Sequence, residues 1–142
     1  MTRLPRRNPC GAFVLAVALA LGFGCSSIVP PETRVVAPID SSMPATLYVV
    51  TNDEGETLFA SLRRAGFTLV RDPRESNAAL NVRFGSWRAR RSCGQVRNVV
   101  YDLRLNGVRV AVIKGRGWTG SCSPNILGAM SSELARLFKG DR

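Results

Sequence analysis

Apolar and polar residues alternate over three stretches in the second half of the chain. The alternation covers 80–85, 99–105 and 108–112, and it predicts three strands that each have one apolar face. Asn106-Gly107 lies between the last two strands and favours a two-residue type I′ turn. We therefore expect a hairpin within an antiparallel meander.

The other apolar patterns add two strands and two helices to this meander. Residues 46–51 and 67–71 are rich in β-branched and aromatic side chains and predict strands. Apolar positions at helical spacing predict one helix over 58–65 and another over 126–138. The expected order is β-α-β-β-β-β-α. This is an α+β fold, a mainly antiparallel sheet of about five strands with two helices on one face, in one domain over 46–142.

The Asn106-Gly107 turn also predicts which residues face one another in the hairpin. The expected pairs are Leu105 with Val108, Leu103 with Val110 and Tyr101 with Val112 on one face, and Arg104 with Arg109 and Val100 with Ile113 on the other. Extended to the open end, this ladder sets residue 93 opposite residue 120. Cys93 and Cys122 are therefore expected within disulfide range.

The N-terminus has the pattern of an export signal. Three arginines precede the unbroken apolar run over 13–21, and a small residue, Gly24, lies before Cys25. The apolar stretch over 11–24 is shorter than the roughly 20 residues that a membrane span needs. We expect residues 1–24 to be a cleaved signal peptide, with a retained membrane anchor as the alternative.

Residues 21–25, LGFGC, resemble the lipobox of bacterial lipoproteins. In that family the Cys sulfur receives a diacylglyceryl group and the Cys becomes the first residue of the mature protein. The resemblance implies lipidation of Cys25. Ser26 after it implies transfer to the outer membrane, where the domain would face the periplasm. The alternative is ordinary cleavage after Gly24, which leaves Cys25 as a free thiol.

Residues 26–45 follow the proposed lipid site and contain four prolines without helical or strand periodicity. A proline-rich stretch of this kind is extended and semi-rigid. We therefore expect residues 25–45 to be the lipidated Cys25 and a tether that holds the folded domain away from the membrane.

The four cysteines divide into three uses. Cys10 leaves with the signal and Cys25 carries the lipid. Cys93 and Cys122 then remain together in an oxidising periplasm, where a disulfide persists. Their bond would close a loop of about 30 residues and stabilise the fold by about 3 kcal/mol. Two free, buried thiols are the alternative, and the expected hairpin register argues against it.

The chain is strongly basic. Its 20 basic and 10 acidic residues give a net charge of +10, and removal of Arg3, Arg6 and Arg7 with the signal leaves 17 against 10, or +7. A positive charge favours an anionic partner. For an exported protein we expect envelope lipid phosphates, cell-wall polymer or another envelope protein as the partner, and no nucleic acid.

The residue types argue against catalysis. The chain contains no histidine, which removes the commonest general base and metal ligand. We find no nucleophile motif and no glycine-rich phosphate loop. Asp53, Glu54 and Glu56 cluster where a helix begins, and helix capping explains them better than a metal site. We therefore expect no catalytic residues, no metal and no cofactor.

The candidate binding residues are basic and cluster between Arg83 and Arg116, where nine positive residues accompany one acidic residue, Asp102. The planar guanidinium group of arginine can hydrogen-bond to two phosphate oxygens at once, and tryptophan is favoured at membrane interfaces. The candidates for an anion-binding face are Arg83, Trp87, Arg88, Arg90, Arg91, Arg104, Arg109 and Arg116. Asp102 is expected to form cross-strand ion pairs. A solvated outer sheet face explains the same residues.

Two kinds of function fit this sequence. The first is a non-enzymatic, lipid-anchored protein of the cell envelope that binds a partner through its basic face. The second is an accessory subunit of an envelope complex that pairs through an exposed sheet edge by strand addition. Loss of binding with salt would favour the basic face, and salt-resistant retention of one protein would favour the edge.

Overall fold

The computed structural model describes residues 29–39, 46–53 and 55–139. The expected signal peptide, the lipobox and Cys25 lie outside these residues. The elements in chain order are β1 (Val29–Val35), β2 (Thr46–Thr51), α2 (Glu56–Arg64), β3 (Thr68–Val70), a 3-10 helix η1 (Pro73–Glu75), β4 (Ala78–Arg91), β5 (Gly94–Leu105), β6 (Val108–Trp118) and α3 (Ile126–Lys139). None of the helices in the described residues is long and apolar enough to cross a membrane.

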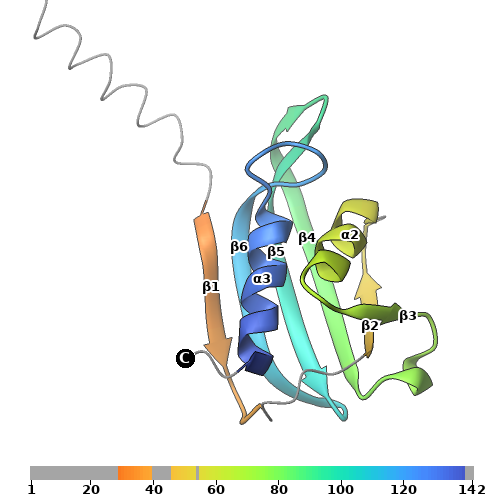
Figure 1. Cartoon of the computed structure of the whole chain (residues 1–142). Coiled ribbons are helices and arrows are strands. Elements are labelled where there is room, and N and C mark those ends of the chain that lie inside the picture. Colours follow the sequence, from red (N-terminus) through yellow and green to blue (C-terminus); the bar gives the residue numbers. More distant parts are fainter. Residues whose placement is uncertain (1–28, 40–45, 54, 140–142) are drawn as a thin grey trace, which may run out of the picture.

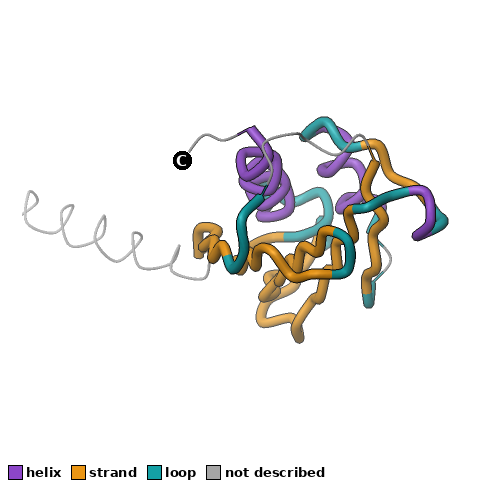
Figure 2. The backbone as a smooth tube through the Cα atoms, turned by 90° about the horizontal axis from the view of Figure 1, so that it is seen from below, coloured by secondary structure: helices purple, strands orange, loops and turns teal. Residues whose placement is uncertain are grey.

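The fold has two layers, a sheet and a pair of helices (Figure 1). The sheet has six strands in the order β1-β6-β5-β4-β2-β3. The pairs β1/β6, β6/β5 and β5/β4 are antiparallel, whereas β2 runs parallel to both of its neighbours. Both α2 and α3 cover the same face, and the other face is left open (Figure 2). The predicted α+β class and the placement of both helices on one face are confirmed, with six strands in place of about five.

The sixth strand, β1, corrects the expected tether. Residues 29–35 pair with β6, with Thr33 opposite Ile113 and Val35 opposite Ala111. The amide of Val36 continues the pairing by donating to the carbonyl oxygen of Val110 at 2.8 Å. Pro30 and Pro31 hid this strand from the sequence pattern. They are tolerated because β1 is an edge strand and because they lie at a register irregularity between Val29 and Glu32, where the pairing with β6 is interrupted.

The hairpin register differs from the expected one by a single residue. Leu105 pairs with Val108 and Arg104 with Arg109, as predicted, but Leu103 then pairs with Ala111 and Tyr101 with Ile113. Val110 is therefore an extra residue in β6, which is the definition of a β-bulge. The predicted pairs Leu103–Val110, Tyr101–Val112 and Val100–Ile113 are wrong for this reason.

The bulge decides which side chains of β6 enter the core. In the structure Ile113 and Gly115 face the helices, and Lys114 lies on the open face between them. Without the bulge, Lys114 would point at α3 in place of Gly115. A Cβ atom at Gly115 would lie only 3.1 Å from side-chain atoms of both Ile126 and Met130. The extra residue thus allows α3 to pack closely on the sheet.

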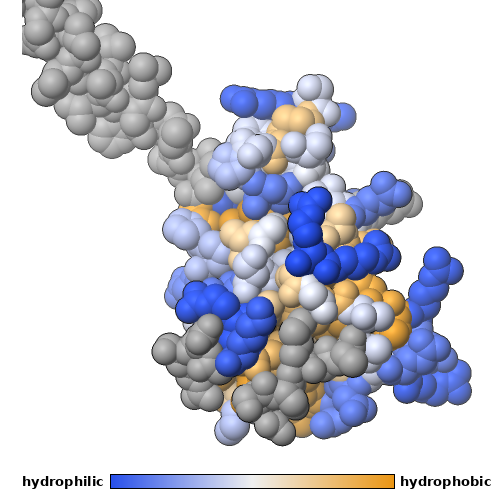
Figure 3. Space-filling view, in the orientation of Figure 1, coloured by the Kyte–Doolittle hydropathy of each residue, from blue (hydrophilic) through white to orange (hydrophobic). Residues whose placement is uncertain are grey.

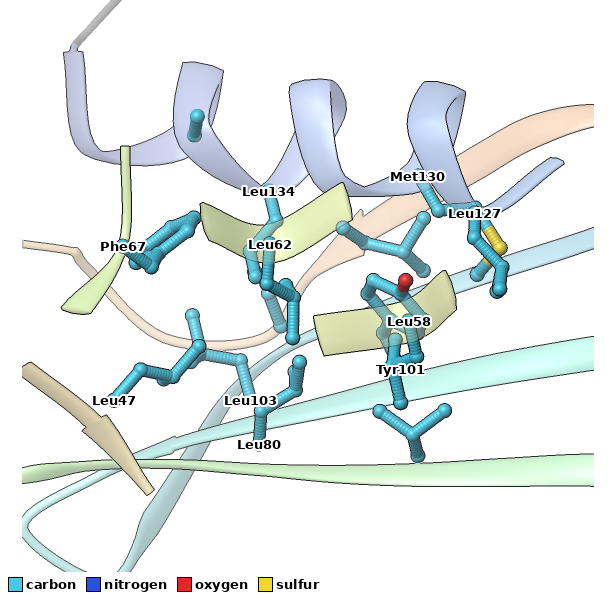
Figure 4. Close-up of a cluster of buried hydrophobic side chains, with 14 of the residues drawn as sticks. Leu47, Leu58, Leu62, Phe67, Leu80, Tyr101, Leu103, Leu127, Met130 and Leu134 are labelled. Atoms are coloured by element: carbon cyan, nitrogen blue, oxygen red, sulfur yellow. The ribbon is translucent and has the colours of Figure 1, made fainter. Parts of the chain in front are cut away.

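The core lies between the sheet and the two helices (Figure 4). Leu47, Leu80 and Leu103 point from the strands towards Leu58 and Leu62 of α2 and Leu134 of α3, and all six are buried. Phe67 meets Phe138 edge to face, with ring centroids 6.1 Å apart. These contacts explain why the apolar stripes of both helices were readable from spacing alone.

Tyr101 is the largest side chain buried on β5, and its hydroxyl lies 3.2 Å from the hydroxyl of Ser131 in α3. Burial raises the pKa of the Tyr101 phenol well above its usual range, because the charged form would be desolvated, and the hydrogen bond to Ser131 offsets only part of this effect. The pair satisfies the polar atoms that the core would otherwise leave unpaired.

Candidate anion-binding surfaces

The predicted basic face is divided between two places in the structure. Arg83, Arg104, Arg109 and Arg116 belong to the sheet face that the helices leave open. Trp87, Arg88, Arg90 and Arg91 lie in the last part of β4, which pairs with the start of β5 and projects past the rest of the sheet. We call residues 87–97, the end of this hairpin, the β4–β5 arm. The sequence predicted one continuous face because it gave no sign of how far β4 extends.

The open sheet face carries the first group. Strand register aligns Arg83 of β4 with Val100 of β5, Lys114 of β6 and Glu32 of β1 in one row. A hollow of ≈ 620 Å³ lies over this part of the sheet. The charged residues that line it are Arg34, Arg83, Arg109 and Lys114, which are basic, and Glu32 and Asp102, which are acidic. Sequence reasoning missed Glu32 and Arg34 because their strand was expected to be tether.

One of the two acidic residues in this hollow is already paired. Asp102 is 5% exposed and accepts from Arg109, with Nε 3.0 Å and Nη2 2.6 Å from its carboxylate oxygens. Arg104 Nε lies 4.0 Å from the same carboxylate. The hydrogen bond to Asp102, followed by the charge of that carboxylate, raises the pKa of the Arg109 guanidinium. The expected cross-strand ion pair of Asp102 is confirmed with Arg109 of β6, whereas Arg104 lies on the same strand as Asp102.

Three basic residues of the hollow keep their charge free for a ligand. Among the described residues, no carboxylate forms a salt bridge with Arg34, Arg83 or Lys114. Glu32, the other acidic residue in the lining, is the Cα partner of Lys114 but forms no salt bridge with any of the described residues. The open face therefore presents guanidinium and ammonium groups over a hollow, an arrangement that suits phosphate or carboxylate oxygens.

The second group lies on the β4–β5 arm, whose tip is fastened by a disulfide. Cys93 is bonded to Cys122, with their Cα atoms 4.9 Å apart, so the structure contains the predicted bond. The carbonyl oxygen of Cys93 also accepts from the amides of Ser121 and Cys122 at 2.7 and 3.2 Å. These contacts hold the tip of the arm against the loop that leads into α3.

Exposed side chains cover the arm itself. Trp87 is 57% exposed, and Arg88, Arg90 and Arg91 are all exposed. The Arg91 guanidinium lies over the Trp118 ring, 4.9 Å from its centroid. In the space-filling view, hydrophilic side chains project from the arm at the top of the molecule (Figure 3).

Arg97 is a basic residue of the same region that serves the fold. Its guanidinium stacks over the Phe84 ring at 5.0 Å and is hydrogen-bonded to Asp53. Asp53 therefore neutralises an arginine at the base of the arm, and it lies before Gly55, the residue at the N-cap of α2. The expectation that Asp53 caps this helix is wrong. In the described part of the chain, no group of three acidic, Cys or His residues could hold a metal ion.

Comparison with known proteins gives no family for this chain. No protein-family model and no curated protein matches it. A PelC dodecamer from Paraburkholderia phytofirmans is 15% identical, with 77% of this chain and 95% of that chain covered and a TM-score of 0.43. A DUF4136 family protein from Bacteroides thetaiotaomicron is 10% identical, with coverage of 81% and 95% and a TM-score of 0.45. A minor lipoprotein from Acinetobacter baumannii is 12% identical, with coverage of 71% and 95% and a TM-score of 0.36.

Proposed function

We propose that this chain is a non-enzymatic, lipid-anchored protein of the cell envelope that binds an anionic envelope component on its open sheet face. Cys25 carries the lipid, the anchor lies in the outer membrane, and the domain faces the periplasm. The protein works without a cofactor. The ligand presents phosphate or carboxylate groups, as lipopolysaccharide and cell-wall polymer do.

The hollow on the open face is the observation that carries the binding proposal. Arg34, Arg83 and Lys114 line it without salt bridges to described carboxylates, and α2 and α3 both lie on the opposite face of the sheet (Figure 2). A face that served only to stabilise the fold would gain from neutralising these charges, as Asp102 does for Arg109. The surplus of positive charge favours an external anion.

Two further observations support an exported, non-catalytic protein. The disulfide between Cys93 and Cys122 persists in an oxidising compartment and is rare in the cytosol. The chain also contains no histidine, the commonest general base in enzymes.

The alternative, pairing through a sheet edge, receives less support from the two edges. At one edge β1 contains Pro30 and Pro31, which have no N–H to donate to an added strand. At the other edge β3 spans only the three residues Thr68–Val70. Strand addition relies on a run of free backbone groups, and each edge offers a short one.

Lipidation is tested by the intact mass of the full-length protein after expression with its own signal in a Gram-negative host. We expect loss of residues 1–24, together with a diacylglyceryl group and an N-acyl chain on Cys25. A mature protein that begins at Cys25 with an unmodified thiol would refute the anchor. A Cys25→Ser variant should remain in the unprocessed, unacylated form.

Binding is tested by retention of the same protein on immobilised lipopolysaccharide as salt is raised. We expect Arg83→Glu/Lys114→Glu to lose retention, because both changes reverse charge in the hollow. Arg63→Glu/Arg64→Glu is the matched control. It changes the net charge by the same amount, but both residues belong to α2, which packs against the opposite face of the sheet from the hollow. Equal retention of both variants, or retention that salt does not weaken, would overturn the proposal.

A further inference from the structure

We propose that the β4–β5 arm docks on the anionic lipid surface that holds the anchor, so that the domain stands on the membrane by its arm. This inference rests on the proposed acylation of Cys25. It assigns the arm a role separate from that of the open sheet face, which this orientation leaves accessible from the side.

The first reason is that β1 begins at the end of the sheet from which the arm projects. Val29, the first residue of β1, is the Cα partner of Arg116 in β6, and Arg116 is the partner of Asn98 in β5. Followed backwards from Asn98, β5 runs into the arm and ends at Gly94. Figure 1 shows the start of β1 and the tip of the arm at the same end of the molecule.

The second reason is that the chain segment between Cys25 and Val29 is about as long as the part of the arm that extends past Val29. Asn98 and Gly94 are four residues apart, so the arm extends about 13 Å past the level of Val29 at the rise of a strand. Cys25 also lies four residues before Val29, and a fully extended chain of that length reaches at most about 14 Å. An acylated Cys25 therefore brings the arm within reach of the lipid surface.

The third reason is the chemistry of the arm. Arg88 and Arg90 are exposed, and no described carboxylate forms a salt bridge with either. Guanidinium groups bind lipid phosphates in bidentate fashion, and an exposed Trp is enriched where a membrane meets water. Trp87, which is 57% exposed, lies beside Arg88 and supplies this interfacial contact.

The fourth reason is that the arm is held in place before it meets any lipid. The disulfide between Cys93 and Cys122 and the bonds to the Cys93 carbonyl fasten its tip to the loop before α3. A docking element that is already ordered loses little conformational entropy when it binds. The phosphate chemistry would also fit a free anion, but the short link to Cys25 commits the arm to a lipid surface.

The experiment uses the full-length acylated protein with Trp118→Phe, which leaves Trp87 as the only tryptophan. The protein is reconstituted in vesicles of phosphatidylcholine alone and in vesicles of phosphatidylcholine with phosphatidylglycerol. In the anionic vesicles we expect a blue shift of the Trp87 emission and quenching by acrylamide that is lower by about twofold or more. Raising the ionic strength from about 0.1 to 1 M should reverse both changes.

Charge reversal identifies the groups that hold the arm on the surface. In anionic vesicles Arg88→Glu/Arg90→Glu should restore the quenching seen in phosphatidylcholine, whereas the matched control Arg63→Glu/Arg64→Glu should leave the protection intact. Acylated protein whose Trp87 is quenched equally in both kinds of vesicle would overturn the docking alone. Protein whose mass shows no acyl chain would overturn the anchor, and with it the premise of docking.

Discussion

The Arg109 guanidinium of β6 reaches diagonally across the open sheet face to hold the buried carboxylate of Asp102 in β5, with Nη2 and Oδ2 2.6 Å apart. The Cα partner of Asp102 is Val112, so the contact spans the β-bulge at Val110. Asp102 is 5% exposed, and a carboxylate at that depth requires a partner. Arg109, one of the arginines predicted to bind a ligand, therefore has a structural role.

We expect Arg109→Met to lower the midpoint of urea denaturation clearly, because it leaves the Asp102 carboxylate buried with Arg104 4.0 Å away as its remaining cation. Arg104→Met is the matched control and should change the midpoint much less, since the bond from Arg109 to Asp102 remains. Equal midpoints for the two variants would show that the Arg109–Asp102 pair contributes nothing particular to stability.

The disulfide gives a prediction about stability. Cys93 and Cys122 are 29 residues apart in sequence, and a loop of that length corresponds to about 3–4 kcal/mol in the free energy of unfolding. Cys93→Ser/Cys122→Ser should lose about that amount in urea denaturation, whereas Cys25→Ser should lose none. A thiol count of the denatured, unreduced wild-type protein provides an independent check, since free thiols at both positions would contradict the bond.

Tyr101 predicts a fall in stability at alkaline pH. Burial raises the pKa of its phenol in the folded state, so the unfolded state releases this proton at lower pH. The free energy of unfolding is therefore unaffected by the titration of this group below a pH of about 10, the ordinary pKa of tyrosine. Above that pH the unfolded state loses the Tyr101 proton first, and the free energy of unfolding falls as the pH rises further. Tyr101→Phe should lose about 1 kcal/mol below pH 10 with the hydrogen bond to Ser131, and its stability should fall less steeply above that pH.

Ser131→Ala is the control for the pH effect of Tyr101. It removes the same hydrogen bond, which joins the two hydroxyls at 3.2 Å, but it keeps the buried phenol. Its free energy of unfolding should therefore still fall above pH of about 10. Parallel profiles for Tyr101→Phe and the wild-type protein would rule out Tyr101 as the source of the alkaline loss.

Two glycines predict opposite effects of the same substitution. A Cβ atom at Gly94 would lie 1.7 Å from the carbonyl oxygen of Thr119, whereas one at Gly128 in α3 would meet nothing within 4 Å. Gly94→Ala should destabilise strongly, because the arm would have to separate from the loop before α3. Gly128→Ala should raise the free energy of unfolding by about 0.5–1 kcal/mol, the usual difference in helix propensity. Thermal denaturation of both variants measures the contrast.

Local patterns made much of the fold readable from the sequence. The alternation in the strands that contain Leu80, Tyr101 and Val110, and the turn at Asn106-Gly107, follow from neighbouring residues alone. The proximity of Cys93 and Cys122 followed from the same turn. It survived the register error because the observed ladder, with Val96 opposite Trp118, sets residue 93 opposite residue 121 and so one position nearer to Cys122 than predicted.

The features that the sequence did not reveal depend on residues far away in the chain. The bulge at Val110 is needed because α3 approaches Gly115 through Ile126 and Met130, and spacing within β6 contains no sign of that contact. The division of the basic residues likewise depends on how far β4 continues beyond its apolar part. A run of exposed residues does not distinguish a long hairpin from a loop.

The last prediction concerns β1, where sequence and structure disagree most. In the structure, residues 29–35 form an edge strand. The Val36 amide is hydrogen-bonded to the carbonyl oxygen of Val110 at 2.8 Å, and Thr33 Oγ1 donates to Glu133 of α3 at 3.0 Å. Hydrogen exchange of the full-length protein should then show slow exchange at the Val36 amide, and Glu133→Ala should speed it by removing the contact between β1 and α3. A free tether would exchange at the rate of an unprotected peptide in both proteins, and it would also remove the short link on which docking of the arm depends.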